Sequence, residues 1–211
     1  MLRVAVLASG RGSNLRALLD AIRRGDLDAC IVGVFRDTAT AGARAPARDA
    51  GSAATHVDPK ACATRLDFDR ALFDRVDASG ADLIVCAGFM RILSPEVVAP
   101  RVARMINIHP SLLPRYPGLH THQRALDAGD REHGASVHVV IPALDAGPVI
   151  AQTRLAIEAG DTAETLAARL LPREHRLLVQ VVRWCGERRL RFDAERVHFD
   201  ERLLTGPLAV D

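Results

Sequence analysis

Lysine is nearly absent from this sequence of 211 residues. Of the 28 basic residues, Lys60 is the single lysine and the other 27 are arginines. A phosphate loop of the Walker type requires Gly-Lys followed by Ser or Thr, whereas Lys60 lies between a proline and an alanine. Schiff-base chemistry requires a buried lysine, for which a residue beside a proline is a poor candidate. The sequence therefore argues against both chemistries, and we attribute the excess of arginine mainly to genomic base composition.

Charge of one sign and paired cysteines are also lacking. The 28 basic and 26 acidic residues give a net charge of +2, which argues against nucleic acid or an anionic membrane as a partner. The four cysteines form no C-x-x-C pair; they are Cys30, Cys62, Cys86 and Cys185. Their wide spacing argues against a disulfide framework and against a zinc ribbon.

Long hydrophobic runs are missing as well. No apolar stretch approaches the roughly 20 residues that span a membrane, and the run 4–8 is too short for the core of a signal peptide. We therefore expect a soluble protein in the cytoplasm. Because 48% of the residues are hydrophobic, the chain can bury a substantial core, and its length fits one domain over residues 1–211.

Short apolar runs alternate with segments of helical spacing along the chain. The expected strands are residues 2–8, 31–35, 54–57, 82–87, 105–108, 135–141 and 148–157. The expected helices run from Ser13 or Asn14 to about residue 25 and over 41–50, 66–78 and 162–184, the last capped by Asp161 or Thr162. The tail from Leu190 predicts short strand or coil. This order predicts an α/β fold with an open, mostly parallel, twisted sheet and helices on both faces.

The segment 109–122 interrupts this pattern. It holds three prolines and three histidines, which are too many helix breakers for a helix, and it predicts an ordered functional loop. His120 and His122, with His133 and His138 nearby, suggest a metal site. Because no cysteine or carboxylate stands at ligand spacing beside them, we expect no metal.

A glycine-rich turn, residues 9–14, separates the first strand from the first helix. Glycines let the backbone approach a ligand closely, and free N–H groups at a helix start favour a phosphate. A dinucleotide fingerprint with Asp37 as ribose ligand is the sharper alternative, but Leu15 replaces its third glycine. A tight turn without any ligand is the other alternative.

Three polar residues suit acyl chemistry. Asn107 and His109 are two apart in an expected strand, so they face the same side at its carboxyl end. An amide can stabilise a developing oxyanion while an imidazole moves a proton. Asp145 lies in a turn, where an Asx-turn is the ordinary role, but contact with His109 would raise the pKa of the imidazole toward neutrality. For His109 the alternative is a histidine satisfied by loop backbone.

An apolar segment, residues 88–95, follows the most strongly apolar strand. Its Phe, Met, Ile and Leu side chains could line a pocket for a flat aromatic ligand or could pack in the core.

Taken together, five strings resemble the phosphoribosylglycinamide formyltransferase family of purine biosynthesis. The strings occur in the family's order, and the resemblance covers nearly the whole chain; they are Ser9–Leu15, Ala87–Leu93, Asn107–Pro114, Tyr116–His122 and Leu144–Pro148. The resemblance implies that 10-formyltetrahydrofolate and glycinamide ribotide are the substrates, with no metal, in a monomer or a homodimer.

The resemblance also implies a role for each candidate residue. Asn107, His109 and Asp145 would be catalytic, with protonated His109 and Asn107 stabilising the oxyanion and Asp145 helping to relay the proton. The ribotide residues would be Gly12, Ser13, Asn14 and Glu174. The folate residues would be Arg65, Met90, Arg91, Ile92, Leu93, Asn107, Ile141, Pro142, Ala143, Leu144 and Asp145. Residues 1–100 would form the ribotide half, 101–190 the catalytic and folate half, and 191–211 a tail.

Two positions depart from the family pattern, and three alternatives stay open. Arg36-Asp37 replaces a frequent Ser-Asn, and Leu171 replaces a frequent Gln, for which Arg173 could substitute as a contact. Methionyl-tRNA formyltransferase would carry a further tRNA-binding domain, and formyltetrahydrofolate deformylase an N-terminal regulatory domain. A non-catalytic folate or nucleotide module is the alternative from another class.

Overall fold

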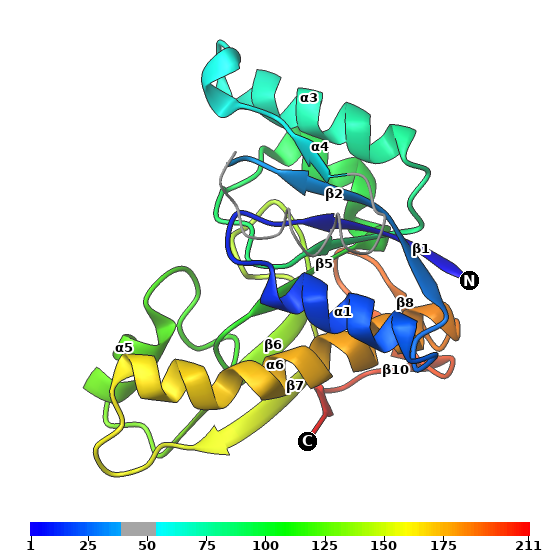
Figure 1. Ribbon diagram of the computed structural model, residues 1–211. Coiled ribbons are helices and arrows are strands. Elements are labelled where there is room, and N and C mark those ends of the chain that lie inside the picture. The colour runs from blue at the N-terminus through cyan, green and yellow to red at the C-terminus, as the bar shows by residue number, and fades with distance from the viewer. Residues whose placement is uncertain (39–53) are drawn as a thin grey trace.

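One open sheet runs through the whole computed structural model, which describes residues 1–38 and 54–211 (Figure 1). Within these residues the sheet has eight strands in the order β11-β7-β6-β5-β4-β1-β2-β3. Their bounds are β1 Leu2–Leu7, β2 Ala29–Arg36, β3 Ala54–His56, β4 Leu83–Cys86, β5 Met105–His109, β6 Glu132–Val139, β7 Val149–Ala156 and β11 Leu208–Ala209.

The pairing of the strands is mostly parallel, as the sequence predicts. β6 is the exception, because it runs antiparallel to both β5 and β7. The five other pairs are all parallel. Every residue of β4 is buried, and so are the last four of β1, which explains why these strands are continuous apolar runs.

Helices cover both faces of the sheet. Their bounds are α1 Ser13–Arg23, α3 Arg65–Ala78, α4 Pro95–Val98, α5 Thr121–Asp127 and α6 Ala163–Gly186. Two short 3-10 helices cover Pro59–Ala61 and Ala99–Arg104. The crossovers through α1 and α3 run in opposite directions along the sheet, so right-handed connections place these helices on opposite faces. Figure 1 shows α1 and α6 side by side across one face.

Helix ends follow the sequence at α6 but not at α1. Thr162 caps α6 through a reciprocal capping box with Thr165, as one of the two predicted caps. The prediction of Ser13 or Asn14 as cap of α1 is wrong, because Gly12 occupies the cap position at φ 76° and both residues lie inside the helix. The short α4 and α5 were not predicted. The predicted helix 41–50 lies outside the described residues.

The chain ends in short strands, as predicted for the tail. β8 (Leu190–Phe192), β9 (Val197–Phe199) and β10 (Arg202–Leu203) form a separate antiparallel sheet. β11 then returns to the edge of the main sheet beside β7. In the parts of the chain that the structure describes, no helix is long and apolar enough to cross a membrane.

Candidate active site

The candidate site begins at the point where the strand order reverses. From β1 the chain goes to β2 on one side, and it returns from β3 to β4 on the other side of β1. The carboxyl ends of β1 and β4 therefore border a crevice, the usual ligand position in such sheets. Two hydrogen bonds join its walls, because the Ser9 N–H donates to the Gly88 carbonyl (3.0 Å) and the Met90 N–H to Ser9 Oγ (3.0 Å).

Asn107 is held by a histidine of the neighbouring strand. The antiparallel register of β5 and β6 sets His138 opposite Asn107, and Asn107 Nδ2 lies 3.0 Å from His138 Nε2. His138 Nδ1 lies 2.9 Å from the Val139 carbonyl, which can only accept, so a neutral His138 has its proton on Nδ1. His138 Nε2 then accepts one amide N–H of Asn107, and the second amide N–H is left for a ligand.

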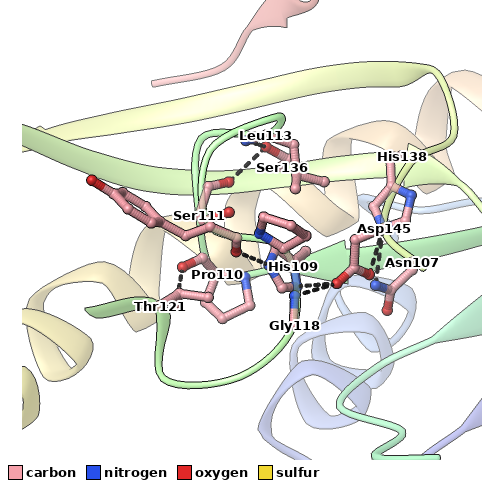
Figure 2. Close-up of polar contacts among 12 residues, drawn as sticks. Asn107, His109, Pro110, Ser111, Leu113, Gly118, Thr121, Ser136, His138 and Asp145 are labelled. Carbon is pink, nitrogen blue, oxygen red and sulfur yellow. Dashed lines mark hydrogen bonds and ion pairs between the residues drawn. The ribbon is translucent and has the colours of Figure 1, made fainter. Parts of the chain in front are cut away.

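Asp145 lies between two histidines, as Figure 2 shows. Its Oδ2 is 3.5 Å from His109 Nδ1, and its Oδ1 is 3.5 Å from His138 Nε2. The Gly118 N–H donates to Asp145 Oδ2 (2.8 Å) and so ties the loop to the turn. On its other side, His109 Nε2 donates to the Tyr116 carbonyl (2.9 Å). The contact between Asp145 and His109 that the sequence left open is therefore present.

The pKa of His109 differs from the sequence expectation. Burial lowers the pKa of this imidazole below its ordinary 6.5, and the Tyr116 carbonyl and the Asp145 charge, which both raise it, do not offset burial. Asp145 thus raises the pKa of His109, as the sequence predicts, but burial of the imidazole outweighs this effect, so the net shift is downward. Burial raises the pKa of Asp145, but the adjacent His138 side chain, the Gly118 N–H that donates to it and the charge of His109 bring it below its usual value.

An apolar cavity opens beside Asn107 and Asp145. Its wall includes three of the four side chains expected from residues 90–93 and all five residues from 141 to 145: Arg91, Ile92, Leu93, Ile141, Pro142, Ala143, Leu144 and Asp145. Cys86 also lines it, and burial first, then the Asp145 charge, raises the pKa of this thiol to about 12. Among the described residues, Arg65 and Met90 are not on this wall; Arg65 is exposed at the start of α3.

A second candidate site, for an anionic group, lies at the start of α1. No side chain caps this helix, so the N–H groups of its first turn, at Ser13 and Asn14, stay open to an anion. Gly12 adopts the left-handed conformation that the turn requires. Glu174 on α6 is 9% exposed, and burial raises its pKa to about 7, with a hydrogen bond from Asn14 opposing. Asn14 Oδ1 is buried without a partner.

The residues that depart from the family pattern lie at the end of β2 and on α6. Arg36 ends β2, and the buried Asp37 after it has Oδ2 3.8 Å from a guanidinium nitrogen of Arg91. Leu171 and Arg173 are both partly buried on α6.

Two of the histidines considered for a metal site, His122 on α5 and His133 on β6, contact each other. His133 Nε2 lies 2.9 Å from His122 Nδ1, with the rings edge to face. Burial lowers the pKa of His133 to about 4. Within residues 1–38 and 54–211, no three His, Cys, Asp or Glu side chains are grouped closely enough to hold a metal ion.

Sequence reasoning missed three groups that orient the polar residues: His138, the Tyr116 carbonyl and the Gly118 N–H. His138 entered only as a metal candidate, because its position opposite Asn107 depends on the register of β5 and β6. The other two are backbone groups, which a side-chain pattern does not reveal. The glycine in Tyr116–His122 was the one available signal for a close backbone approach.

Comparison with known proteins assigns the chain to a family. Residues 2–182 match the formyl transferase family. The chain belongs to the formyl transferase family. Within it, the phosphoribosylglycinamide formyltransferase of Escherichia coli (strain K12) is 42% identical over 203 residues, which are 96% of this chain and 96% of that protein. The trifunctional purine biosynthetic protein adenosine-3 of Bos taurus is 41% identical over 175 residues. These residues are 83% of this chain and 17% of that protein.

Solved structures of related proteins agree with the fold. The phosphoribosylglycinamide formyltransferase of Coxiella burnetii superposes with a TM-score of 0.95 at 42% identity, covering 100% of this chain and 99% of that one. The formyltetrahydrofolate deformylase of Burkholderia mallei superposes with a TM-score of 0.84 at 29% identity, covering 94% of this chain and 69% of that one.

Proposed function

We propose that this protein transfers the formyl group of 10-formyltetrahydrofolate to the amine of glycinamide ribotide, a step of purine biosynthesis. One observation carries the proposal: Asn107, His109 and Asp145 converge at the crevice, next to an apolar cavity. An acyl-transfer site needs an oxyanion donor and a proton carrier beside a pocket for the acyl donor. The full-length similarity to glycinamide ribotide formyltransferases supports the choice of substrates.

The cavity suits the ring system of the folate. Its wall combines aliphatic side chains, among them Ile92 and Ile141, with the backbone of the turn 141–145. Flat heterocycles bind between such walls and hydrogen-bond to the exposed backbone groups. Ile92 is 55% exposed and Leu144 52%, so apolar surface remains for a ligand to cover. Arg65 and Met90 complete the proposed folate residues outside this wall.

The ribotide phosphate binds at the glycine-rich turn in this proposal. Gly12, Ser13 and Asn14 offer backbone N–H groups at the positive end of α1. Glu174 accepts hydrogen bonds from the ribose hydroxyls, and this gives a buried carboxyl a reason to be retained. Residues 1–100 and 101–190 thus both contribute to each subsite.

The reaction forms one bond to the formyl carbon and breaks another. The substrate amine attacks the formyl carbon, and the free N–H of Asn107 donates to the developing oxyanion. Protonated His109 stabilises the same charge, and the carboxylate of Asp145 favours this protonated form. The bond to folate N10 then breaks, while the proton lost by the amine passes through Asp145 and water to N10.

Folate release tests the proposal. Purified protein is mixed with 10-formyltetrahydrofolate and glycinamide ribotide, and release of tetrahydrofolate is followed spectroscopically. His109→Ala is expected to lower kcat by about 10²–10³, the usual cost of losing one such donor. His198→Ala on β9, outside the site, is the matched control and keeps the parent rate. An inactive parent, or a fully active His109→Ala variant, would refute the mechanism.

The same assay separates the deformylase alternative. A deformylase releases formate with water alone, whereas the proposed transferase requires the ribotide. Formate produced at the full rate without ribotide would favour the deformylase.

We place the reaction in the cytoplasm, since both substrates are charged, water-soluble metabolites. The proposed site is built from one chain, so a monomer and a homodimer are both compatible with it. Specific activity independent of protein concentration is the expected result.

A further inference from the structure

A fully buried carboxyl group lies behind the apolar cavity. Asp69 on α3 is 0% exposed, and its Oδ2 accepts two hydrogen bonds from Ser94, one from the backbone N–H (2.8 Å) and one from Oγ (2.6 Å). Ser94 is itself 3% exposed, and Asp69 Oδ1 is buried without a partner. Burying a polar group that is only half satisfied costs stability, so packing alone does not explain Asp69.

Helix capping does not explain this pair either. Ser94 occupies the cap position of α4, where a serine hydroxyl normally accepts a backbone N–H of the first turn. Here Ser94 makes no side-chain cap bond, and its hydroxyl donates to Asp69. The pair therefore joins α3 to the segment that ends at Ser94.

That segment, residues 88–94, has no regular structure, and four of its residues line the cavity: Phe89, Arg91, Ile92 and Leu93. Its first end is fixed by Ser9, through the bonds to Gly88 and Met90. Within the described parts of the chain, no backbone hydrogen bond holds residues 91–93. The other end is fixed at Ser94, whose N–H and hydroxyl donate to Asp69 and whose carbonyl accepts the Val97 and Val98 N–H groups of α4.

Helix α3 makes a second contact with the cavity wall through Phe68, the residue before Asp69. The ring of Phe68, which is 1% exposed, lies under the guanidinium of Arg91, 5.0 Å from ring centroid to Cζ. Arg91 lines the cavity. Both contacts support the cavity wall from the side of α3. Phe68 packs against Arg91, and Asp69 accepts hydrogen bonds from Ser94.

We propose that the Asp69–Ser94 pair positions the cavity wall for the formyl folate, so that its loss weakens folate binding without affecting the ribotide or the chemical step. Asp69 and Ser94 are positioning residues, since they act through Arg91, Ile92 and Leu93. The inference rests on the proposed function, because it assigns the folate to this cavity.

Ser94→Ala is the principal test, since it removes the hydroxyl bond and no capping bond. Steady-state kinetics are measured with each substrate varied in turn. The KM for 10-formyltetrahydrofolate is expected to rise about five- to tenfold, the effect of one hydrogen bond of this kind. The KM for glycinamide ribotide and kcat stay within about twofold of the parent. Ser94→Thr keeps the hydroxyl and restores the parent KM.

Ser79→Ala is the matched control. Ser79 caps the far end of α3, and its hydroxyl donates to the Val76 carbonyl (2.5 Å) away from the cavity. This variant is expected to keep all three kinetic constants. If Ser94→Ala does not fold, Asp69→Asn is the second test, because its amide oxygen still accepts both Ser94 bonds but without the carboxylate charge that strengthens them, and a smaller rise in the same folate KM is expected.

Four results would overturn the inference. They are an unchanged KM for the folate in Ser94→Ala, an equal rise in both KM values, a loss confined to kcat, and a Ser94→Thr variant as impaired as Ser94→Ala. A parent that neither binds formyl folate in calorimetric titration nor releases tetrahydrofolate would instead refute the proposed function. An active parent with a normal Ser94→Ala variant refutes only the positioning role.

Discussion

Replacing Glu174 by glutamine should stabilise the protein, and more so as the pH rises. The carboxyl is 9% exposed between α1 and α6, and burial raises its pKa from 4.5 to about 7. Glutamine keeps the shape and the hydrogen bonding toward Asn14 but has no charge to bury. The ionised carboxyl therefore costs stability, and the ribotide contact proposed above would give it a role.

The pH dependence follows from the sign of this shift. Below about pH 4.5 the carboxyl is protonated in the folded and the unfolded chain, so it costs nothing. Between pH 4.5 and about 7 the unfolded chain loses its proton first, and the free energy of unfolding falls as the pH rises. Above pH 7 the full cost remains, and at about 1.4 kcal/mol per pKa unit it is about 3 kcal/mol.

Thermal unfolding of parent and Glu174→Gln at pH 5 and pH 8 measures this cost. The stability advantage of the variant should grow by about 2.5 kcal/mol between the two pH values. For a chain of this size, that growth corresponds to about 5–10 °C in Tm. Glu164→Gln is the control, since Glu164 is exposed on the same helix and hydrogen bonds from its own backbone and from Thr162 lower its pKa. A Glu174→Gln advantage that is constant or shrinks with pH would refute the reasoning.

Three further predictions concern the site and its supports. Asp145→Asn should shift the alkaline limb of kcat/KM to lower pH, because Asp145 raises the pKa of His109, and an unshifted limb contradicts this. Gly12→Ala should lower Tm by about 2–4 °C through strain at φ 76°, whereas Gly10→Ala, with open space around its Cβ, should not, as calorimetry will show. Gly147→Ala should lower kcat, because its Cβ would lie 2.0 Å from the Val139 carbonyl oxygen and displace the turn that carries Asp145; an unchanged kcat would argue against that displacement.

Most of the sheet could be predicted from the sequence, because its strands are short apolar runs that periodicity reveals. The wrong predictions concern features that leave no local pattern in the sequence. α5 begins at Thr121, within the segment whose prolines argued against a helix. The antiparallel pairing of β6 has no signature in an apolar run. Gly12 caps α1 with its backbone alone, so the search for a capping side chain chose its neighbours.

In the candidate site too, some contacts could be predicted from the sequence and others could not. Asn107 and His109 could be paired from the sequence, since a two-residue separation in a strand fixes a shared face. His138 could not be placed beside Asn107, because that contact depends on strand register. Asp69 carries no sequence signal, because an aspartate in a helical pattern is ordinarily a solvated residue.

The sequence by itself determined which groups are available. It supplied one lysine, a glycine-rich turn, an amide and an imidazole two residues apart, and the order of elements that builds a mostly parallel sheet. Only the tertiary structure decided what these groups do to each other. It brought Asp145 within 3.5 Å of His109 from 36 positions away and made burial, not charge, the dominant influence on the pKa of the imidazole. Distance and desolvation are properties of the folded chain, and no local pattern encodes them.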